Sequence, residues 1–199
     1  MDKNSFRVSC MNKLKKIGKK SHYLKDKKVN RWLYKNIKSK KCKVVMLYIP
    51  LKIEINISDL IKWLRKENVT VLVPFMVGKS FRLVEYRLPL NIKKFSIKEP
   101  NISNKIYKKI DLAIVPIIGI DKEFRRIGFG KGFYDRFFEA NSTYIKEVLF
   151  IGREACIASE NITDNYDVQG DSYVTSNKVF IKNNSKNNIK KKSRSFLLE

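Results

Sequence analysis

The sequence predicts a single α/β domain with three layers, in which helices cover both faces of a mostly parallel sheet. Short apolar runs rich in β-branched residues recur along the chain, and segments with helical periodicity separate them. The 199 residues suffice for one hydrophobic core, and 43% of them are hydrophobic. We divide the chain into this domain, residues 1–181, and a basic tail, residues 182–199, which lacks apolar periodicity and is expected to be disordered.

Helical periodicity is clearest in the basic N-terminal part of the chain. Val29, Leu33 and Ile37 recur at helical spacing and predict a narrow apolar stripe on an otherwise polar helix. Ser58 is expected to be the N-cap of a later helix, since its hydroxyl can accept a backbone hydrogen bond. The predicted helices cover residues 3–41, as one helix or two, residues 58–68 and residues 133–140.

The predicted strands are short apolar runs bounded by turn residues. They cover residues 43–50, 69–74, 81–87, 111–116, 148–152 and 173–175. Residues 88–109 contain Pro89 and Pro100 and predict a long excursion from the sheet. Loops of that length in a compact domain are usually functional or mobile.

The chain carries 43 basic and 19 acidic side chains, a net charge of +24. Such an excess ordinarily favours nucleic acid as a partner. Here 16 basic side chains precede residue 44 and six lie in the tail, away from the chemical motifs. Aromatic interleaving and an arginine-rich face are also missing, so the charge is interpreted as a lysine-rich composition. A nucleic-acid-binding protein on an α/β scaffold remains the alternative.

Cysteine and histidine usage excludes several kinds of site. Cys10, Cys42 and Cys156 are odd in number and far apart, which predicts neither a disulfide framework nor a metal site. His22 is the single histidine and is expected to be solvated on a basic helix. No apolar run is long enough for a membrane helix, and the first residues lack the apolar core of a secretory signal. We therefore expect a reducing, cytoplasmic setting without a membrane partner.

The segment 111–138 concentrates the residues that can do chemistry. Gly128, Gly130 and Gly132 follow a predicted strand and alternate with Phe129 and Lys131. Glycines at this density let backbone amides approach a phosphate, and the following helix directs its N-terminus at the same anion. The spacing matches neither a Walker A loop nor a dinucleotide fingerprint. A tight turn without a ligand is therefore the alternative to an anion site.

Charged residues beside these glycines favour the anion site. Arg125, Arg126 and Lys131 supply positive charge, and Asp135 can hold a magnesium ion next to phosphates. The string DLAIVP, a loop with Gly119 and Asp121, and then RIGFGKGFYDR closely resemble the signature of the 5-formyltetrahydrofolate cyclo-ligase family. Further similar stretches are KNSFR at 3–7, YIP at 48–50 with Glu54, Glu99-Pro100, and DVQGD at 167–171.

The resemblance implies a three-layer α/β fold and a reaction that depends on ATP and magnesium. In that reaction 5-formyltetrahydrofolate is cyclised to 5,10-methenyltetrahydrofolate, with release of ADP and phosphate. It further implies a small-molecule substrate and, we expect, a monomer. A relative that binds nucleotide or folate without turnover is a second alternative.

The resemblance also implies roles for individual residues. The implied ATP contacts are Lys3, Arg7, Arg126, Gly128, Gly130, Lys131, Gly132 and Tyr134, among which Lys131, Arg126 and Tyr134 act in catalysis. The implied folate contacts are Ile49, Glu54, Phe129, Gly130, Lys131, Gly132 and Phe133, and the implied magnesium ligands are Asp135 and Asp167. Phe133 departs from the family, which commonly has Tyr there, and Tyr166 stands where His is frequent. Without the resemblance, Lys3 and Arg7 would be interpreted as solvated charges.

Overall fold

The computed structural model describes residues 1–17, 19–92, 98–103, 105–182 and 190–192. The helices are α1 (Lys3–Lys15), α2 (Lys19–Ser39), α3 (Ser58–Lys66) and α4 (Phe133–Asn141), followed by the 3₁₀ turn η2 (Ser142–Tyr144). The main sheet contains β1 (Val44–Met46), β2 (Thr70–Val77), β3 (Ser80–Glu85), β6 (Leu112–Pro116), β9 (Val148–Ile151), β10 (Ser172–Val174), β11 (Val179–Ile181) and β12 (Lys190–Lys192). Two small antiparallel pairs join β4 (Asn91–Ile92) to β5 (Lys98–Glu99) and β7 (Gly119–Ile120) to β8 (Arg126–Ile127).

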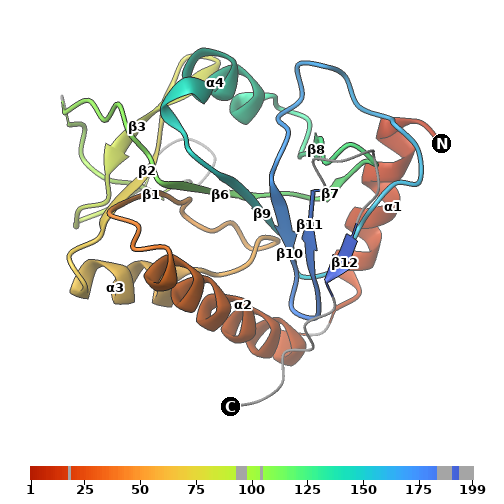
Figure 1. Ribbon diagram of the computed structural model, residues 1–199, viewed down its shortest axis with the longest axis horizontal. Coiled ribbons are helices and arrows are strands. Elements are labelled where there is room, and N and C mark those ends of the chain that lie inside the picture. The colour runs from red at the N-terminus through yellow and green to blue at the C-terminus, as the bar shows by residue number, and fades with distance from the viewer. Residues whose placement is uncertain (18, 93–97, 104, 183–189, 193–199) are drawn as a thin grey trace.

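The main sheet has the strand order β12-β11-β10-β9-β6-β1-β2-β3 (Figure 1). Its central neighbours from β10 to β2 are parallel. The outer strands β3, β11 and β12 run antiparallel to their partners. The predicted mostly parallel sheet is therefore confirmed, with antiparallel strands added at both edges.

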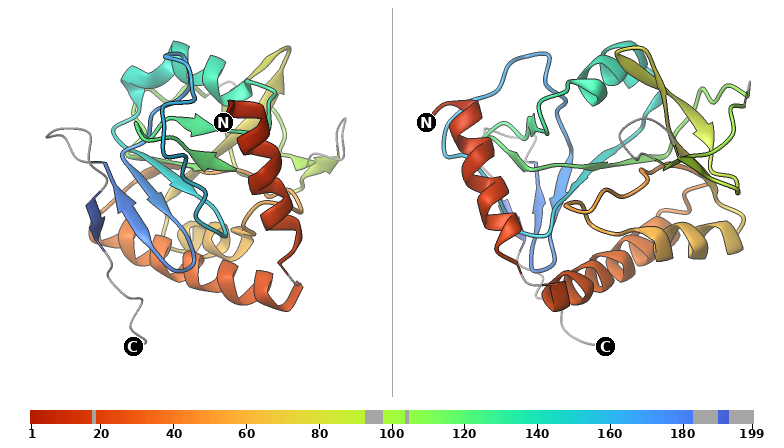
Figure 2. Two further views of the ribbon diagram at one scale, coloured as in Figure 1. Left: turned by 90° about the vertical axis from the view of Figure 1, so that its right-hand side faces the viewer. Right: turned by 180° about the vertical axis from the view of Figure 1, so that it is seen from behind.

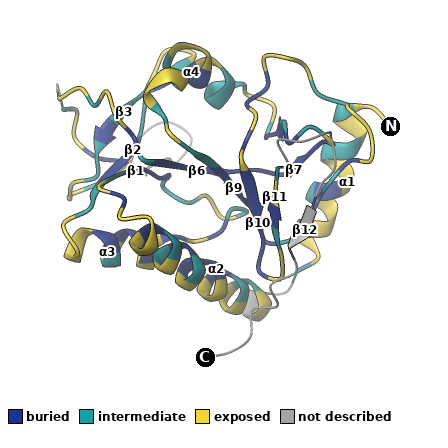
Figure 3. Cartoon of the chain, in the orientation of Figure 1, coloured by how far each residue is buried: buried dark blue, intermediate teal, exposed yellow. Residues whose placement is uncertain are grey.

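Each face of the sheet buries its own core, because side chains alternate between the faces along a strand. Val45, Val71 and Ile114 pack toward α2 and α3, where the predicted stripe of α2 is buried. Met46 and Phe150 pack on the opposite face, which α4 covers (Figures 1 and 3). The structure thus confirms three layers with helices on both faces.

Helix α1 lies beside the β7–β8 end of the molecule, apart from the two main helical layers (Figure 2). The side chain of Asp2 caps its N-terminus by accepting from the amides of Asn4 and Ser5. Cys10 on α1 forms a disulfide with Cys156, with a Cα–Cα distance of 6.1 Å. The sequence-based expectation of unpaired cysteines is wrong for this pair, because the fold brings together positions 146 residues apart.

Two further local predictions are wrong. Ser58 is the first residue of α3 rather than its N-cap, and its amide donates to the Asn56 side chain at 3.0 Å. His22 is half-buried rather than solvated, and its Nε2 atom has no hydrogen-bond partner within the described residues. Burial lowers the pKa of His22, and the charge of Arg153 acts in the same direction.

The predicted tail lies only partly within the described residues. Lys190–Lys192 form β12, which pairs antiparallel with β11, so this short stretch is ordered as an edge strand. Residues 183–189 and 193–199 lie outside the described residues, and their expected disorder stays a prediction. The excursion 88–109 contributes β4 and β5, and within it residues 93–97 and 104 lie outside the description. In the part of the chain that is described, no helix combines the length and apolarity needed to cross a membrane.

Candidate active site

The predicted site residues collect around the carboxyl ends of the central parallel strands. From β1 the chain passes to α3 on one face and then to β2, whereas from β6 it passes to α4 on the other face and then to β9. A topological switch point therefore lies between β1 and β6. Ligands of open α/β sheets bind at such a point, outside the carboxyl ends of the strands. The loop after β1 carries Ile49 and Glu54, and the segment after β6 carries the glycine-rich turn.

Three glycines shape the turn between β8 and α4. Gly130 and Gly132 have φ angles of +88° and +65°, in the left-handed region that favours glycine. A Cβ atom on Gly128 would lie 2.4 Å from the guanidinium of Arg126, so any larger residue would require that side chain to shift. Gly132 is also the N-cap of α4, which directs the helix N-terminus toward this turn.

Arg126 lies beneath the turn and is only 5% exposed. Its Nη1 atom is 3.6 Å from Oδ2 of Asp135, and its guanidinium lies 4.7 Å from the ring centre of Tyr134. Its Nε atom is buried and has no hydrogen-bond partner among the described residues. A buried cation with an unused donor suits an anionic ligand, because such a group gains both charge neutralisation and a hydrogen bond on binding.

Helix α1 brings one basic side chain to the turn and a second one to the segment around Asp167. Nε of Arg7 donates to the Gly128 carbonyl at 2.8 Å, and Nζ of Lys3 donates to Asp167 at 2.5 Å. Lys3 also pairs with Asp164 at 3.3 Å. Interpreting Lys3 and Arg7 as solvated charges is therefore wrong, since both contact segments more than 100 positions away.

The aromatic and lysine residues of the turn differ in burial. Lys131 is exposed, and its carbonyl accepts from Arg136 at 2.7 Å. Phe129 is half-buried against the cluster around the disulfide, and Phe133 is half-buried below Arg136. Ile49 packs against the core on the α2 and α3 face. The structure thus places these residues around the turn and the loop after β1.

Asp135 and Asp167 lie on adjoining segments. Oδ1 of Asp135 accepts from the amide of Val168 at 3.3 Å, next to Asp167. Oδ2 of Asp167 accepts from the amide of Asp164 at 2.7 Å, which closes a turn. The described residues contain no group of three or more His, Cys, Asp or Glu side chains that could hold a metal. Two carboxylates nevertheless fit magnesium, which completes its shell with water and phosphate oxygens.

Glu54 connects the loop after β1 to the turn electrostatically. Its carboxylate accepts from the amide of Leu51 at 2.9 Å. Burial raises the pKa of Glu54 to about 7, against the opposing effects of the Leu51 amide and the charge of Arg126. Burial also raises the pKa of Tyr134, and the charge of Glu54 adds to that rise. The charge of Arg126 thus acts on the pKa of Glu54, and the charge of Glu54 acts on the pKa of Tyr134.

Two supporting features were not predicted from the sequence. Asp121 is fully buried and accepts from the amides of Glu123 and Arg125, both at 3.0 Å, which holds the β7–β8 hairpin. An aspartate at the start of a turn is a recognised signal for this arrangement. Asp26 and Arg153 form a buried ion pair across 127 positions, and no spacing rule signals such a pair.

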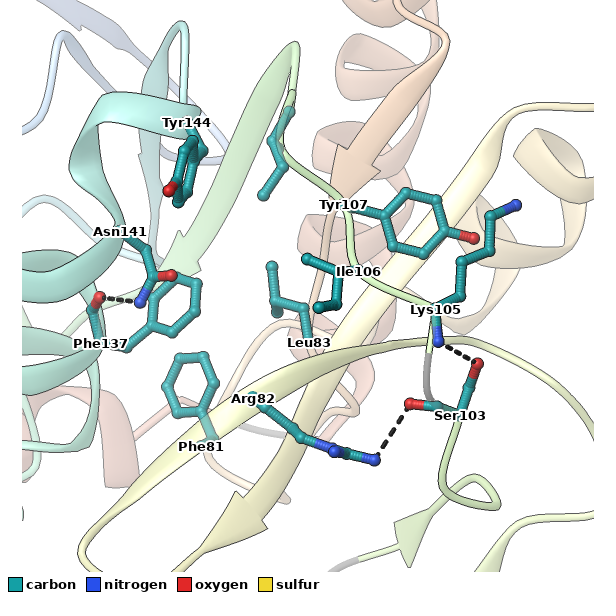
Figure 4. Close-up of a pocket in the computed structure, with 11 residues that line it drawn as sticks. Phe81, Arg82, Leu83, Ser103, Lys105, Ile106, Tyr107, Phe137, Asn141 and Tyr144 are labelled. Atoms are coloured by element: carbon teal, nitrogen blue, oxygen red, sulfur yellow. Dashed lines mark hydrogen bonds between the residues drawn. The ribbon is translucent and has the colours of Figure 1, made fainter.

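A cavity of about 180 Å³ lies at the C-terminal end of α4, whereas the glycine-rich turn lies at its N-terminal end (Figure 4). Phe81, Phe137 and Ile106 are among its lining residues, together with Asn141 and Tyr144. None of the site residues predicted from the sequence lines it. The cavity is therefore separate from the glycine-rich turn.

The comparison with models of protein families shows to which family this chain belongs. The model of the 5-formyltetrahydrofolate cyclo-ligase family matches residues 1–158. The chain belongs to that family. Membership of the cyclo-ligase family makes the chain a ligase, and every predicted site residue except Asp167 lies within the match.

Individual cyclo-ligases agree with this assignment. The 5-formyltetrahydrofolate cyclo-ligase of Mycoplasma genitalium is 31% identical over 156 residues, which cover 76% of this chain and 84% of that protein. The enzyme of the same name from Haemophilus influenzae is 30% identical over 143 residues, covering 66% and 75%.

Solved structures support the fold. The 5,10-methenyltetrahydrofolate synthetase of Aquifex aeolicus matches with a TM-score of 0.73 and 25% identity, covering 100% of this chain and 97% of that one. The 5,10-methenyltetrahydrofolate synthetase of Mycoplasma pneumoniae matches with a TM-score of 0.68 and 21% identity, covering 88% and 99%. The second match, at its lower identity, supports the fold alone.

Proposed function

We propose that this cyclo-ligase converts 5-formyltetrahydrofolate to 5,10-methenyltetrahydrofolate, using ATP and magnesium and releasing ADP and phosphate. The formyl oxygen on N5 attacks the terminal phosphorus of ATP, and ADP leaves. N10 then attacks the activated carbon and loses its proton, and phosphate leaves to form the methenyl bridge. Such phosphoryl transfer needs positioning and charge neutralisation more than a side-chain nucleophile.

The ATP phosphates are proposed to bind at the glycine-rich turn. Gly128, Gly130 and Gly132 supply a close backbone approach, and α4 presents its N-terminus there. Arg126 lies beneath the turn with an unused Nε donor among its described surroundings, and Lys131 is exposed on it. We expect these two side chains to act on the transferring phosphoryl group, with Tyr134 stacked on the guanidinium.

Folate is proposed to bind between the loop after β1 and the turn, next to Glu54, Ile49, Phe129 and Phe133. Arg126 carries this proposal, because its buried guanidinium lies 3.6 Å from Asp135 on the proposed metal side, and its charge lowers the pKa of Glu54 on the proposed folate side. A side chain that acts on both the proposed folate site and the proposed metal site can help to bring ATP next to the formyl oxygen of the folate. Asp135 and Asp167 are the proposed magnesium ligands, and a bound magnesium ion supplies neutralisation of phosphate charge.

The proposed reactants are small molecules, and every proposed contact comes from one chain. We therefore propose that the enzyme acts as a monomer, with no requirement for nucleic acid or a membrane.

The direct test adds ATP, magnesium and 5-formyltetrahydrofolate to the purified protein and follows the near-ultraviolet absorbance of the methenyl product. Reactions without ATP or without magnesium serve as controls and should show no product. ATP consumption that ignores 5-formyltetrahydrofolate would contradict the proposed substrate. Salt-sensitive RNA binding without any turnover would favour the nucleic-acid-binding alternative instead.

A further inference from the structure

A buried ion pair joins α2 to the segment after β9. Asp26 is 7% exposed and Arg153 is 5% exposed. Nε and Nη2 of Arg153 donate to the two carboxylate oxygens of Asp26 at 2.8 and 2.9 Å. This two-point geometry fixes the orientation of both side chains, because the planar guanidinium matches the plane of the carboxylate.

Both members of the pair also bond to the backbone of the loop after β1. Nη1 of Arg153 donates to the carbonyl of Ile53 at 2.6 Å. Oδ2 of Asp26 accepts from the amide of Asn56 at 3.0 Å. The two contacts lie on either side of Glu54, so the pair holds the chain immediately before and shortly after that residue.

Neighbouring side chains complete this support. Asn30, one turn after Asp26 on α2, donates through Nδ2 to the Asn56 carbonyl at 2.8 Å. The hydroxyl of Tyr48 donates to the Ile55 carbonyl at 2.7 Å. The loop between β1 and α3 has no regular secondary structure, so its buried backbone groups need such partners.

We propose that Asp26 and Arg153 are positioning residues for Glu54, because they hold the backbone of the loop on both sides of it. The inference rests on the proposed function, in which Glu54 contacts folate. It assigns a role to two residues that touch neither ATP nor folate. Their effect should therefore be selective for folate, because their backbone contacts lie on the Glu54 loop and not on the glycine-rich turn.

Stability alone does not account for the pair. Burying two charges costs desolvation energy, and well-packed apolar residues of similar volume often stabilise a fold as well or better. An apolar pair cannot, however, bond to the Ile53 carbonyl and the Asn56 amide. Fold stability and loop position can therefore be separated by mutation.

The first variant is Asp26→Asn, which retains the side-chain shape. Its amide nitrogen replaces one carboxylate oxygen, so a donor then faces either Arg153 or the Asn56 amide. We expect the KM for 5-formyltetrahydrofolate to rise at least tenfold and the KM for ATP to stay within twofold, measured well below the melting temperature. Equal rises in both KM values would overturn the proposal.

The second variant is the double substitution Asp26→Leu/Arg153→Met, which removes both charges. We expect it to recover most of the melting temperature that either single substitution loses. The tenfold rise in the KM for 5-formyltetrahydrofolate should persist. Recovery of both stability and folate affinity would overturn the proposal. Glu67→Gln is the matched control, because it breaks the exposed pair at 3.2 Å between Lys38 on α2 and Glu67 at the end of α3, and it should leave both KM values unchanged.

Amide hydrogen exchange separates this inference from the proposed function. We expect residues 53–56 to exchange at least tenfold faster in Asp26→Asn than in the wild type, and α3 to be unaffected. If the wild type fails to convert 5-formyltetrahydrofolate, the proposed function fails. Faster exchange at 53–56 would still support loop positioning, and unchanged exchange would overturn it.

Discussion

The two basic side chains proposed for catalysis occupy opposite environments. Arg126 is buried and pairs with Asp135, so its removal would disturb the fold as well as the chemistry. Lys131 is exposed between two glycines and has little core to pack against. Lys131 is therefore the residue at which chemistry can be tested without unfolding.

Lys131→Ala is expected to reduce turnover while the melting temperature stays within about 1 °C of the wild type, because exposed side chains contribute little to stability. Losing one well-placed charge on a transferring phosphoryl group costs about 2.7–4 kcal/mol, or about 100- to 1,000-fold in kcat. Steady-state kinetics and thermal unfolding provide the measurement. Lys122→Ala, an exposed lysine in the preceding loop, is the control and should retain activity. Wild-type activity in Lys131→Ala would contradict the role of the turn.

Glu54 should make stability depend on pH. Burial raises its pKa from 4.5 to about 7, so the folded state retains a proton that the unfolded state has lost between these values. Stability from this group is therefore present below pH 4.5 and is lost as the pH rises to about 7. The loss amounts to at most about 3 kcal/mol.

Glu54→Gln should remove this dependence. Relative to the wild type, the free energy of unfolding of Glu54→Gln should rise by about 2–3 kcal/mol between pH 5 and pH 8. Urea unfolding at the two pH values measures it, with the exposed Glu139→Gln as a control. An equal difference at both pH values would show that Glu54 titrates normally.

The two aspartates near the turn should share one magnesium ion. Asp135 and Asp167 each contact a basic side chain in this structure, Arg126 and Lys3, and both lie next to Val168. Asp135→Asn and Asp167→Asn should each raise the magnesium concentration for half-maximal rate by about tenfold, a typical mutational loss at a metal site. The double variant should be less than additively worse, because both residues act through one ion. Unchanged magnesium dependence in either single variant would make that aspartate structural.

At the scale of helices and strands, elements with a long apolar pattern were predictable from the sequence. Short elements were less predictable. The apolar stripe of α2 and the central strands followed from periodicity, since a buried face constrains every third or fourth residue of a helix. The start of α3 at Ser58 was predicted correctly, but its N-cap was not, because Ser58 is already helical and its amide donates to the side chain of Asn56. Strand β12 was missed because its three lysines have no apolar pattern and depend on pairing with β11.

The site was predictable where it is local in sequence. The glycine-rich turn and the start of α4 occupy one continuous segment, so their spacing carries the information. The proposed ATP contacts of Lys3 and Arg7 come from the family resemblance, and residue patterns did not predict the bonds of these side chains to Asp167 and Gly128. The Asp26–Arg153 pair and the disulfide depend on tertiary contacts between distant segments, which spacing does not encode.

Removal of the tail tests how much the edge strand β12 contributes to stability and activity. Truncation after Lys182 removes β12 but retains the hydrogen bond from the Lys182 amide to the Asp171 carbonyl. We expect unchanged kcat and KM and a melting temperature within about 4 °C of the wild type, because a short edge strand contributes on the order of 1 kcal/mol. A large loss of turnover would show that the tail contributes to the site.

At the scale of the whole molecule, the disulfide fastens α1 to the rest of the fold. Reduction should lower the free energy of unfolding by about 2–5 kcal/mol, because a cross-link over a long loop restricts the unfolded chain. The KM for ATP should also rise, since α1 carries Lys3 and Arg7. Denaturant unfolding with and without dithiothreitol measures the effect, and Cys10→Ala should be insensitive to the reductant. Equal stability of the wild type in both conditions would contradict a structural disulfide.

The same bridge determines what a backbone cut would do to this enzyme. A protease that cleaves within residues 88–109 separates a piece with Lys3, Arg7 and Glu54 from a piece with the glycine-rich turn. Cys10 lies in the first piece and Cys156 in the second, so the two remain one covalent molecule. Nicked protein should therefore run as one band in denaturing electrophoresis until a thiol is added, and then as two.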